Sequence, residues 1–286
     1  MKANITLNAR PLLRALYVVL ITCTALLAMP KRADAQVYVS LVLAGVVSEY
    51  DEKTGEVINA SFITGLSGPN ELVLSGEDLY IANDGGSVGK YNAKTGAAIS
   101  QSFITGADLV PVGLALLGDD LFVASADGSV GKYNAKTGTA INADFISGLP
   151  SGPVCGLGKL GDILFVANNA GTVGKYNDKT GKSLGGFDVE SPYGIAFLGD
   201  KLFVGSSSTG TIAEYNAKTL KVINASFITG LSGPWQIAVL GDKLFVTNAG
   251  LGTIGEYSAK TGKVINAAFI SIPSESVGIA VKAQSK

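Results

Sequence analysis

The 286-residue chain contains no histidine, and its three arginines and two methionines all lie within the first 35 residues. Histidine is the commonest general base and a frequent metal ligand, so its absence removes the side chain most often used for both kinds of chemistry. Arginine provides the bidentate grip on phosphate, and a domain without arginine is a poor candidate for nucleic-acid binding.

Cysteine is scarce as well, because Cys155 is the only one beyond the N-terminal segment. A single cysteine cannot form an internal disulfide, so a folded domain must be stabilised by packing. We interpret Cys155 as a small buried apolar residue in preference to a reactive thiol. Apolar residues make up 47% of the chain and charged residues 16%, which is sufficient for a core and excludes extended disorder.

Residues 1–35 have the pattern of a secretory signal peptide. Basic residues precede an apolar run over residues 15–29, and small residues stand at Ala33 and Ala35, where a signal peptidase cuts. That run is shorter than the roughly 20 residues of a membrane-spanning helix, although an uncleaved anchor is the alternative. We therefore expect a mature domain over residues 36–286 in a secreted, periplasmic or cell-envelope protein that has no membrane contact after cleavage.

Cleavage would make the domain acidic. Residues 1–35 hold five basic side chains and one acidic side chain, so their removal changes the net charge from −1 to −5. A net negative charge without arginine argues further against a nucleic-acid partner.

The mature part of the chain consists of internal repeats. The block Tyr-Asn-Ala-Lys-Thr-Gly recurs six times with variation, at a spacing of 39 to 43 residues. Its lysines are Lys53, Lys94, Lys136, Lys179, Lys218 and Lys260. This period is typical of a four-stranded propeller blade, which takes ~40–45 residues.

Each repeat predicts four short strands. In one copy the first strand follows Pro111 and the second follows Gly118-Asp119. The third follows a glycine-rich loop, and the fourth, residues 140–146, follows the Asn-Ala-Lys-Thr-Gly turn. Segments of four to seven residues rich in Val, Ile, Phe and Tyr, separated by Gly, Asn and Asp, are typical of antiparallel strands. The fold class is therefore all-β, a six-bladed β-propeller.

The two ends of the chain predict how the ring closes. Residues 37–40 align with a second strand, whereas residues 277–281 align with a first strand and have no partner after them. We expect the C-terminal strand to complete the N-terminal blade, because closure removes the free edges of an open array. The segments Pro111-Val112-Gly113-Leu114-Ala115 and Pro192-Tyr193-Gly194-Ile195-Ala196 resemble the NHL-type repeat of six-bladed propellers. That resemblance implies the fold and leaves the function open.

Functional residues are expected where the copies differ, at the mouth of the central channel. Tyr193 and Trp235 follow the prolines of neighbouring repeats and predict an aromatic platform for a sugar or a flat apolar group, or alternatively a channel plug. Glu71 and Gln236 replace glycine at the next position and are expected to converge near the axis. Asn70 stands at the same position as Tyr193 and Trp235 in another repeat. A polar ring after the second strands, either a ligand contact or ordinary turn chemistry, completes the candidate set with Asn83, Asn168 and Asn248.

Charge also differs between the copies. The residue before the third-strand tyrosine is Lys90, Lys132 and Lys175 in three consecutive repeats, and Glu214, Glu256 and Glu49 in the other three. Shared ancestry within each half explains this difference, and the alternative is a charge-split surface that orients a partner.

These features favour a non-catalytic binding or scaffold module with no cofactor, whose ligand is a glycan, a peptide or an extracellular protein. The alternative is an enzyme, since Pro69-Asn70-Glu71-Leu72 is similar to a stretch of gluconolactonase-type propellers. That resemblance implies a metal-dependent hydrolase that binds Ca²⁺ through Asn70 and Glu71, although Glu71 stands where that family has glycine. A likeness to propeller lyases that inactivate streptogramins fails, because those enzymes need a histidine.

Overall fold

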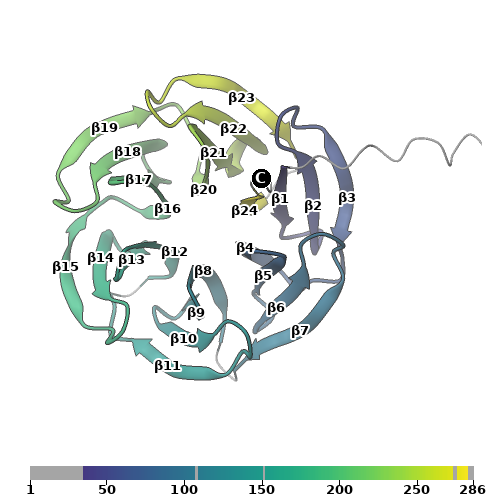
Figure 1. The fold of residues 1–286 in the computed structure, drawn as a ribbon. Coiled ribbons are helices and arrows are strands. Elements are labelled where there is room, and N and C mark those ends of the chain that lie inside the picture. Colours follow the sequence, from purple (N-terminus) through teal and green to yellow (C-terminus); the bar gives the residue numbers. More distant parts are fainter. Residues whose placement is uncertain (1–34, 107–108, 151, 273–275, 283–286) are drawn as a thin grey trace, which may run out of the picture. The chain divides into compact units, whose positions relative to one another are not determined.

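A computed structural model of the chain describes residues 35–106, 109–150, 152–272 and 276–282, so the predicted signal peptide lies outside the described residues except for Ala35. In this part of the chain the strands form six antiparallel four-stranded sheets arranged as a ring (Figure 1). The predicted six-bladed β-propeller is therefore confirmed. None of the described helices has the length and apolar character needed to cross a membrane.

We refer to the six sheets as blades A to F. Blade A contains β1 (Gln36–Leu41), β2 (Val46–Asp51), β3 (Val57–Ile63) and β24 (Ser276–Lys282). Blade B contains β4 (Pro69–Ser75), β5 (Asp78–Asn83), β6 (Ser87–Asn92) and β7 (Ala98–Thr105). Blade C contains β8 (Pro111–Leu117), β9 (Asp120–Ser125), β10 (Val130–Asn134) and β11 (Ala140–Ile146).

The second half of the ring repeats this arrangement. Blade D contains β12 (Val154–Leu160), β13 (Ile163–Asn168), β14 (Thr172–Asn177) and β15 (Ser183–Asp188). Blade E contains β16 (Pro192–Leu198), β17 (Lys201–Ser206), β18 (Thr211–Asn216) and β19 (Val222–Ile228). Blade F contains β20 (Pro234–Leu240), β21 (Lys243–Asn248), the short 3-10 helix η1 (Ala249–Leu251), β22 (Thr253–Ser258) and β23 (Val264–Ser271).

The C-terminal strand closes the ring as predicted. Sheet order in blade A is β24-β1-β2-β3, with Val37 opposite Val281 and Val39 opposite Ile279. Val37 and Val39 are fully buried and Ile279 is nearly so. The two ends of the domain are thus joined through one blade, and the first strands β24, β4, β8, β12, β16 and β20 surround the axis (Figure 1).

The core lies between the blades. Each of six hydrophobic clusters in the described residues combines side chains of two neighbouring blades, as in the cluster that contains Tyr38 and Phe62 of blade A with Leu79 and Ile81 of blade B. Successive side chains of a strand point to opposite faces of its sheet. Both faces of the second strands are buried, so these strands carry apolar side chains on both faces. The apolar area removed from water at these joints is the main stabilising contribution, at roughly 25 cal/mol per Å².

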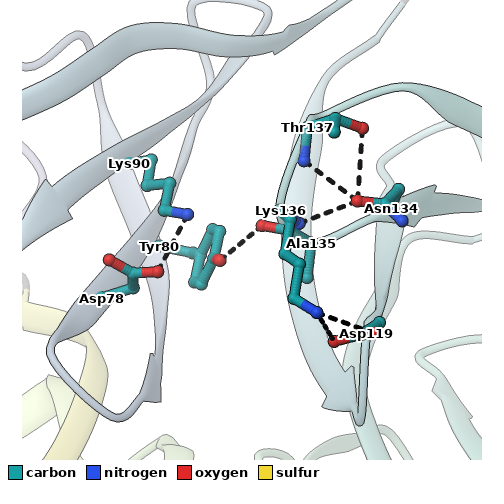
Figure 2. A network of polar contacts seen from close by, with 8 residues as sticks. All are labelled: Asp78, Tyr80, Lys90, Asp119, Asn134, Ala135, Lys136 and Thr137. Carbon is teal, nitrogen blue, oxygen red and sulfur yellow. Dashed lines mark hydrogen bonds and ion pairs between the residues drawn. The ribbon is translucent and has the colours of Figure 1, made fainter.

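Polar contacts also cross the joints between blades. The Tyr38 hydroxyl donates to the Ala93 carbonyl (2.5 Å) and the Tyr80 hydroxyl to the Ala135 carbonyl (2.6 Å; Figure 2). Blade C has phenylalanine at this position, and there the Lys132 ammonium donates to the Asp178 carbonyl at 3.0 Å. Between the last blade and the first, Lys243 pairs with the Glu52 carboxylate at 3.3 Å. These contacts add hydrogen bonds and an ion pair to the apolar packing at four of the six joints.

Four of the charges that distinguish the two halves, those of Lys90, Lys132, Glu214 and Glu256, are buried and paired within their blades. Lys90 lies 2.8 Å from Asp78 of its own blade (Figure 2), and Lys132 lies 2.9 Å from Asp120. In blades E and F the same two positions exchange their charges, and the pairs are Lys201–Glu214 (2.5 Å) and Lys243–Glu256 (2.6 Å). Because the two members of each pair neutralise each other locally, these four side chains do not form a charge-split surface.

Candidate functional site

A cavity of about 730 Å³ opens at one end of the central channel. Its wall is built from the starts of first strands and from the connections between second and third strands. The lining residues are Val42, Asn70, Asp84, Val110, Val112, Ala126, Pro153, Cys155, Tyr193, Trp235 and Ala249. We call this cavity the mouth pocket. Its size falls in the range of small-ligand sites, and most of its lining is apolar.

Two aromatic rings form one side of the mouth pocket. Tyr193 and Trp235 each follow the proline that opens a first strand, and their ring centroids lie 4.5 Å apart with the planes inclined by 60°. Both side chains are half-buried, so they line the cavity without being sealed in the core. Such a pair presents flat apolar area with an indole N–H and a phenol O–H at its edges.

A polar pair contributes to another part of the wall. Asn70 follows Pro69 at the start of β4, and its amide donates to the carboxylate of Asp84 in the connection after β5. Partial burial raises the pKa of the Asp84 carboxyl, while the hydrogen bond from Asn70 opposes that rise. Asp84 carries the only formally charged side chain among the lining residues.

Glu71 and Gln236 connect inner strands of different blades. An oxygen of Glu71 accepts a 2.7 Å hydrogen bond from the Leu114 amide of blade C, and the Gln236 amide donates to the Cys155 carbonyl of blade D at 3.2 Å. Burial raises the pKa of Glu71 to about 8, with the Leu114 hydrogen bond acting in the opposite direction. Each side chain therefore reaches an inner strand of another blade, and neither belongs to the pocket lining.

The other four blades have glycine at this position, and at three of them, Gly156, Gly194 and Gly278, the backbone of the neighbouring inner strand leaves no room for a side chain. A Cβ atom would lie 2.1 Å from the Tyr193 carbonyl oxygen at Gly156 and 2.1 Å from the Asn70 carbonyl oxygen at Gly278. No side chain fits there without a shift of the backbone. Glu71 and Gln236 are thus the two positions at which a side chain replaces the glycine of the inner strands.

Three predicted polar residues are used by the scaffold. Asn83, Asn168 and Asn248 are buried at the ends of second strands and lie outside the pocket lining. The Asn168 amide donates to the Pro150 carbonyl at 3.0 Å, and the Asn248 side-chain oxygen accepts from the Ser232 amide at 2.6 Å. The Asn83 amide donates to the Ile81 carbonyl at 3.3 Å. Asn168 and Asn248 therefore fasten the connection that enters the first strand, while Asn83 bonds within β5.

Cys155 lies in the pocket wall with 6% of its surface exposed. Its thiol donates to the Pro153 carbonyl at 3.4 Å, and burial raises the pKa of the thiol to about 12. A thiol that stays protonated is a poor nucleophile and a poor metal ligand. The interpretation of Cys155 as a buried apolar residue agrees with this geometry.

Comparison of the six sequence copies did not identify the pocket-lining residues that lie in the connections between strands. Val42, Val110, Ala126, Pro153 and Ala249 line the pocket beside the predicted Asn70, Tyr193 and Trp235. Ala126 and Ala249 occupy the same place after the second strand as Asp84, so an alignment of that single position identifies three lining residues.

The residues that the lactonase resemblance assigns to a metal have separate partners. Asn70 bonds to Asp84 of its own blade, whereas Glu71 bonds to the backbone of the next blade. Within the described ranges, no three His, Cys, Asp or Glu side chains are grouped closely enough to hold a metal ion. The geometry of these residues therefore lends no support to a shared metal site at Asn70 and Glu71.

Comparisons with known proteins agree on the fold alone. No protein-family model and no curated protein matches the chain. A chain from a crystal structure of a nidogen/laminin complex is similar with a TM-score of 0.71 and 15% identity, covering 88% of this chain and 100% of that chain. The computationally designed Ika8 protein is similar with a TM-score of 0.57 and 16% identity, covering 85% and 86%. The propeller fold is supported, and the NHL-type relationship stays a prediction.

Proposed function

We propose that this chain is an exported, non-catalytic binding or scaffold module that takes its ligand in the mouth pocket. The observation that carries the proposal is the contact of Tyr193 with Trp235 in the wall of a cavity of about 730 Å³. Large aromatic side chains at the edge of an apolar cavity are typical of binding sites, because they bury much area at a small cost in entropy.

The ligand classes are a glycan, a peptide or a segment of an extracellular protein. An aromatic face accepts the apolar face of a sugar as well as an aliphatic side chain, and Asn70 with Asp84 offers hydrogen-bond acceptors nearby. One of the similar solved structures is of a nidogen/laminin complex, so a role in protein assembly is compatible with this fold. Nucleic acid is not a proposed partner, and neither is the membrane after cleavage of the signal peptide.

The proposal includes no metal cofactor. The protein of residues 36–286 is expected to melt at the same temperature with excess EDTA and with millimolar Ca²⁺. A metal that binds only the folded state at a hundredfold excess over its Kd stabilises that state by about 2.7 kcal/mol, a readily measured shift. A Ca²⁺-dependent rise that is lost in Asn70→Ala or Glu71→Ala would instead support the lactonase alternative.

Glycan and peptide arrays test the proposal directly. We expect residues 36–286 to bind members of at least one class, and Trp235→Ala to abolish that binding. Ile141→Ala is the control, because Ile141 is an exposed apolar residue on outer strand β11 and does not belong to the pocket lining. Binding that survives Trp235→Ala would place the ligand elsewhere, and a protein that binds nothing on either array would contradict the binding role.

A further inference from the structure

The two faces of the propeller differ in charge. The mouth pocket opens on the face made by connections from second to third strands and from each fourth strand to the next first strand. In the described part of these connections the charged side chains are Asp84, Asp127 and Glu190, and no lysine is present. This face therefore carries charge of one sign.

The opposite face carries both signs. Its third-to-fourth turns hold the six repeated lysines, and several of these pair with the aspartate of the neighbouring first-to-second turn. Lys136 lies 2.9 Å from Asp119 (Figure 2), and Lys260 lies 2.6 Å from Asp242. A face of one sign attracts a ligand of the opposite sign more effectively than a face on which the charges are paired.

Within the mouth pocket, Asp84 combines this negative charge with aromatic surface. Asp127 bonds to Ser129, and Glu190 bonds to Ser208 at 3.1 Å; both lie outside the pocket lining. The Asp84 carboxylate receives the Asn70 amide and faces a cavity otherwise lined by apolar and aromatic groups. Its raised pKa indicates that the carboxylate is partly desolvated, a state that a neighbouring cation relieves.

We infer that the mouth pocket selects an organic cation, an ammonium group carried on an apolar body, with the ammonium beside Asp84 and the body against Tyr193 and Trp235. This inference rests on the proposed function and specifies its ligand chemistry. Aromatic rings attract cations through their quadrupole, and the Asp84 carboxylate in another part of the same pocket adds a Coulombic contribution. The same chemistry is present in a free amine and in the lysine side chain of a peptide.

Matched probes test the inference. Trp235 is the only tryptophan, so its fluorescence reports on the pocket, and calorimetry measures the same binding independently. The probes are benzylamine, its neutral counterpart benzyl alcohol, and the lysine analogue N-acetyl-lysinamide. We expect benzylamine to bind about tenfold more tightly than benzyl alcohol, the combined size of an exposed cation–π contact and an exposed ion pair.

Two variants distinguish the contact of the ammonium group with Asp84 from the negative charge of the face as a whole. Asp84→Asn is expected to remove the preference for benzylamine over benzyl alcohol. Asp127→Asn is the control, since it removes a carboxylate from the same face outside the pocket lining. Binding of N-acetyl-lysinamide with the same Asp84 dependence would indicate a peptide source, and binding of benzylamine alone a free amine.

Other outcomes overturn the inference without deciding the proposed function. Equal affinity for benzylamine and benzyl alcohol, or a preference that Asp84→Asn leaves intact, would show that charge at Asp84 does not select the ligand. If calorimetry detects no amine binding, the cation inference is wrong. The proposed binding role is judged separately by the arrays and Trp235→Ala.

Discussion

The Glu71 carboxyl group accepts a 2.7 Å hydrogen bond from the amide of Leu114, on the inner strand of the next blade. Burial raises the pKa of this carboxyl to about 8. In the unfolded chain a glutamate titrates near pH 4.3, so at neutral pH the folded state holds a proton on Glu71 that the unfolded state has lost.

Glu71 should therefore make the domain less stable as the pH rises. Between about pH 4.5 and 8 the folded state binds more protons than the unfolded state, and the free energy of unfolding falls by up to about 1.4 kcal/mol per pH unit. The contribution is complete below pH 4.5 and is lost above pH 8. We expect Glu71→Gln, which keeps an acceptor for Leu114, to remove this part of the slope in urea unfolding curves.

The exposed residue Glu77 provides the control for that experiment. Glu77→Gln should leave the pH dependence of the wild type unchanged. Superimposable slopes for wild type and Glu71→Gln would mean that Glu71 is ionised in the folded protein at neutral pH.

Cys155 should resist thiol reagents in the folded protein. With a pKa of about 12, the thiolate fraction at pH 8 is on the order of one in ten thousand, and the side chain is 6% exposed. We expect negligible reaction with Ellman's reagent over an hour and complete reaction in guanidinium chloride. Rapid labelling of the native protein would show that the pocket wall opens to admit the reagent.

The ion pairs of blades E and F have their charges exchanged relative to the Lys90–Asp78 pair of blade B. We therefore expect that the charges of the pair in blade B can also be exchanged. Lys90→Glu alone places two carboxylates together and should lower the free energy of unfolding by about 3 kcal/mol, as for other broken pairs with a buried member. Adding Asp78→Lys reproduces the arrangement of Lys201 with Glu214 and should restore at least half of that loss. Denaturant unfolding of the two single variants and the double variant measures the coupling.

The exposed pair Asp119–Lys136 is the reference for this cycle. Both of its side chains are more than half exposed, so inverting it should change stability by less than about 1 kcal/mol. If Asp78→Lys fails to improve Lys90→Glu, the reversed pairs of blades E and F depend on their surroundings and not on the pair itself.

Closure by β24 should be essential for folding. Deletion of residues 274–286 removes the partner of β1 and exposes Val37 and Val39, which are fully buried. We expect this truncation to lose cooperative melting and to elute as aggregates in size-exclusion chromatography. A soluble truncation that melts cooperatively would contradict the closure mechanism.

Moving the deleted segment provides a positive control. Placed before Gln36 with a Gly-Asp turn, residues 274–282 would form with β1 the hairpin that blades B to F already have. This permuted chain is expected to melt cooperatively. If the permuted chain does not melt cooperatively, supplying this strand from the N-terminal side is not sufficient for closure.

The propeller fold could be predicted from the sequence because the same pattern of strands and turns occurs in six copies. The fourth strand of blade C was predicted at residues 140–146 and is observed there. The site was harder to predict because position does not determine the direction of a polar side chain. Asn70 lines the pocket and bonds to Asp84 there, whereas Asn168, equally polar, bonds to the Pro150 carbonyl and lies outside the lining. The apolar lining from Val42 and Ala249 required knowledge of how the connections fold over the axis.

The polar contacts at the joints bear on how near-identical repeats find their correct neighbours. The outer strands of blades A and E, Val57–Ile63 and Val222–Ile228, have the same sequence, so apolar packing alone distinguishes them poorly. A tyrosine hydroxyl donates a hydrogen bond across the joint between blades A and B and across the joint between blades B and C. Lys132 does so between blades C and D, and Lys243 forms an ion pair with Glu52 where blade F meets blade A. Phe203 of blade E has no hydroxyl to offer Ala93. A ring assembled with a blade skipped would lose these contacts, so they favour the pairing of each repeat with its correct neighbour in the circle.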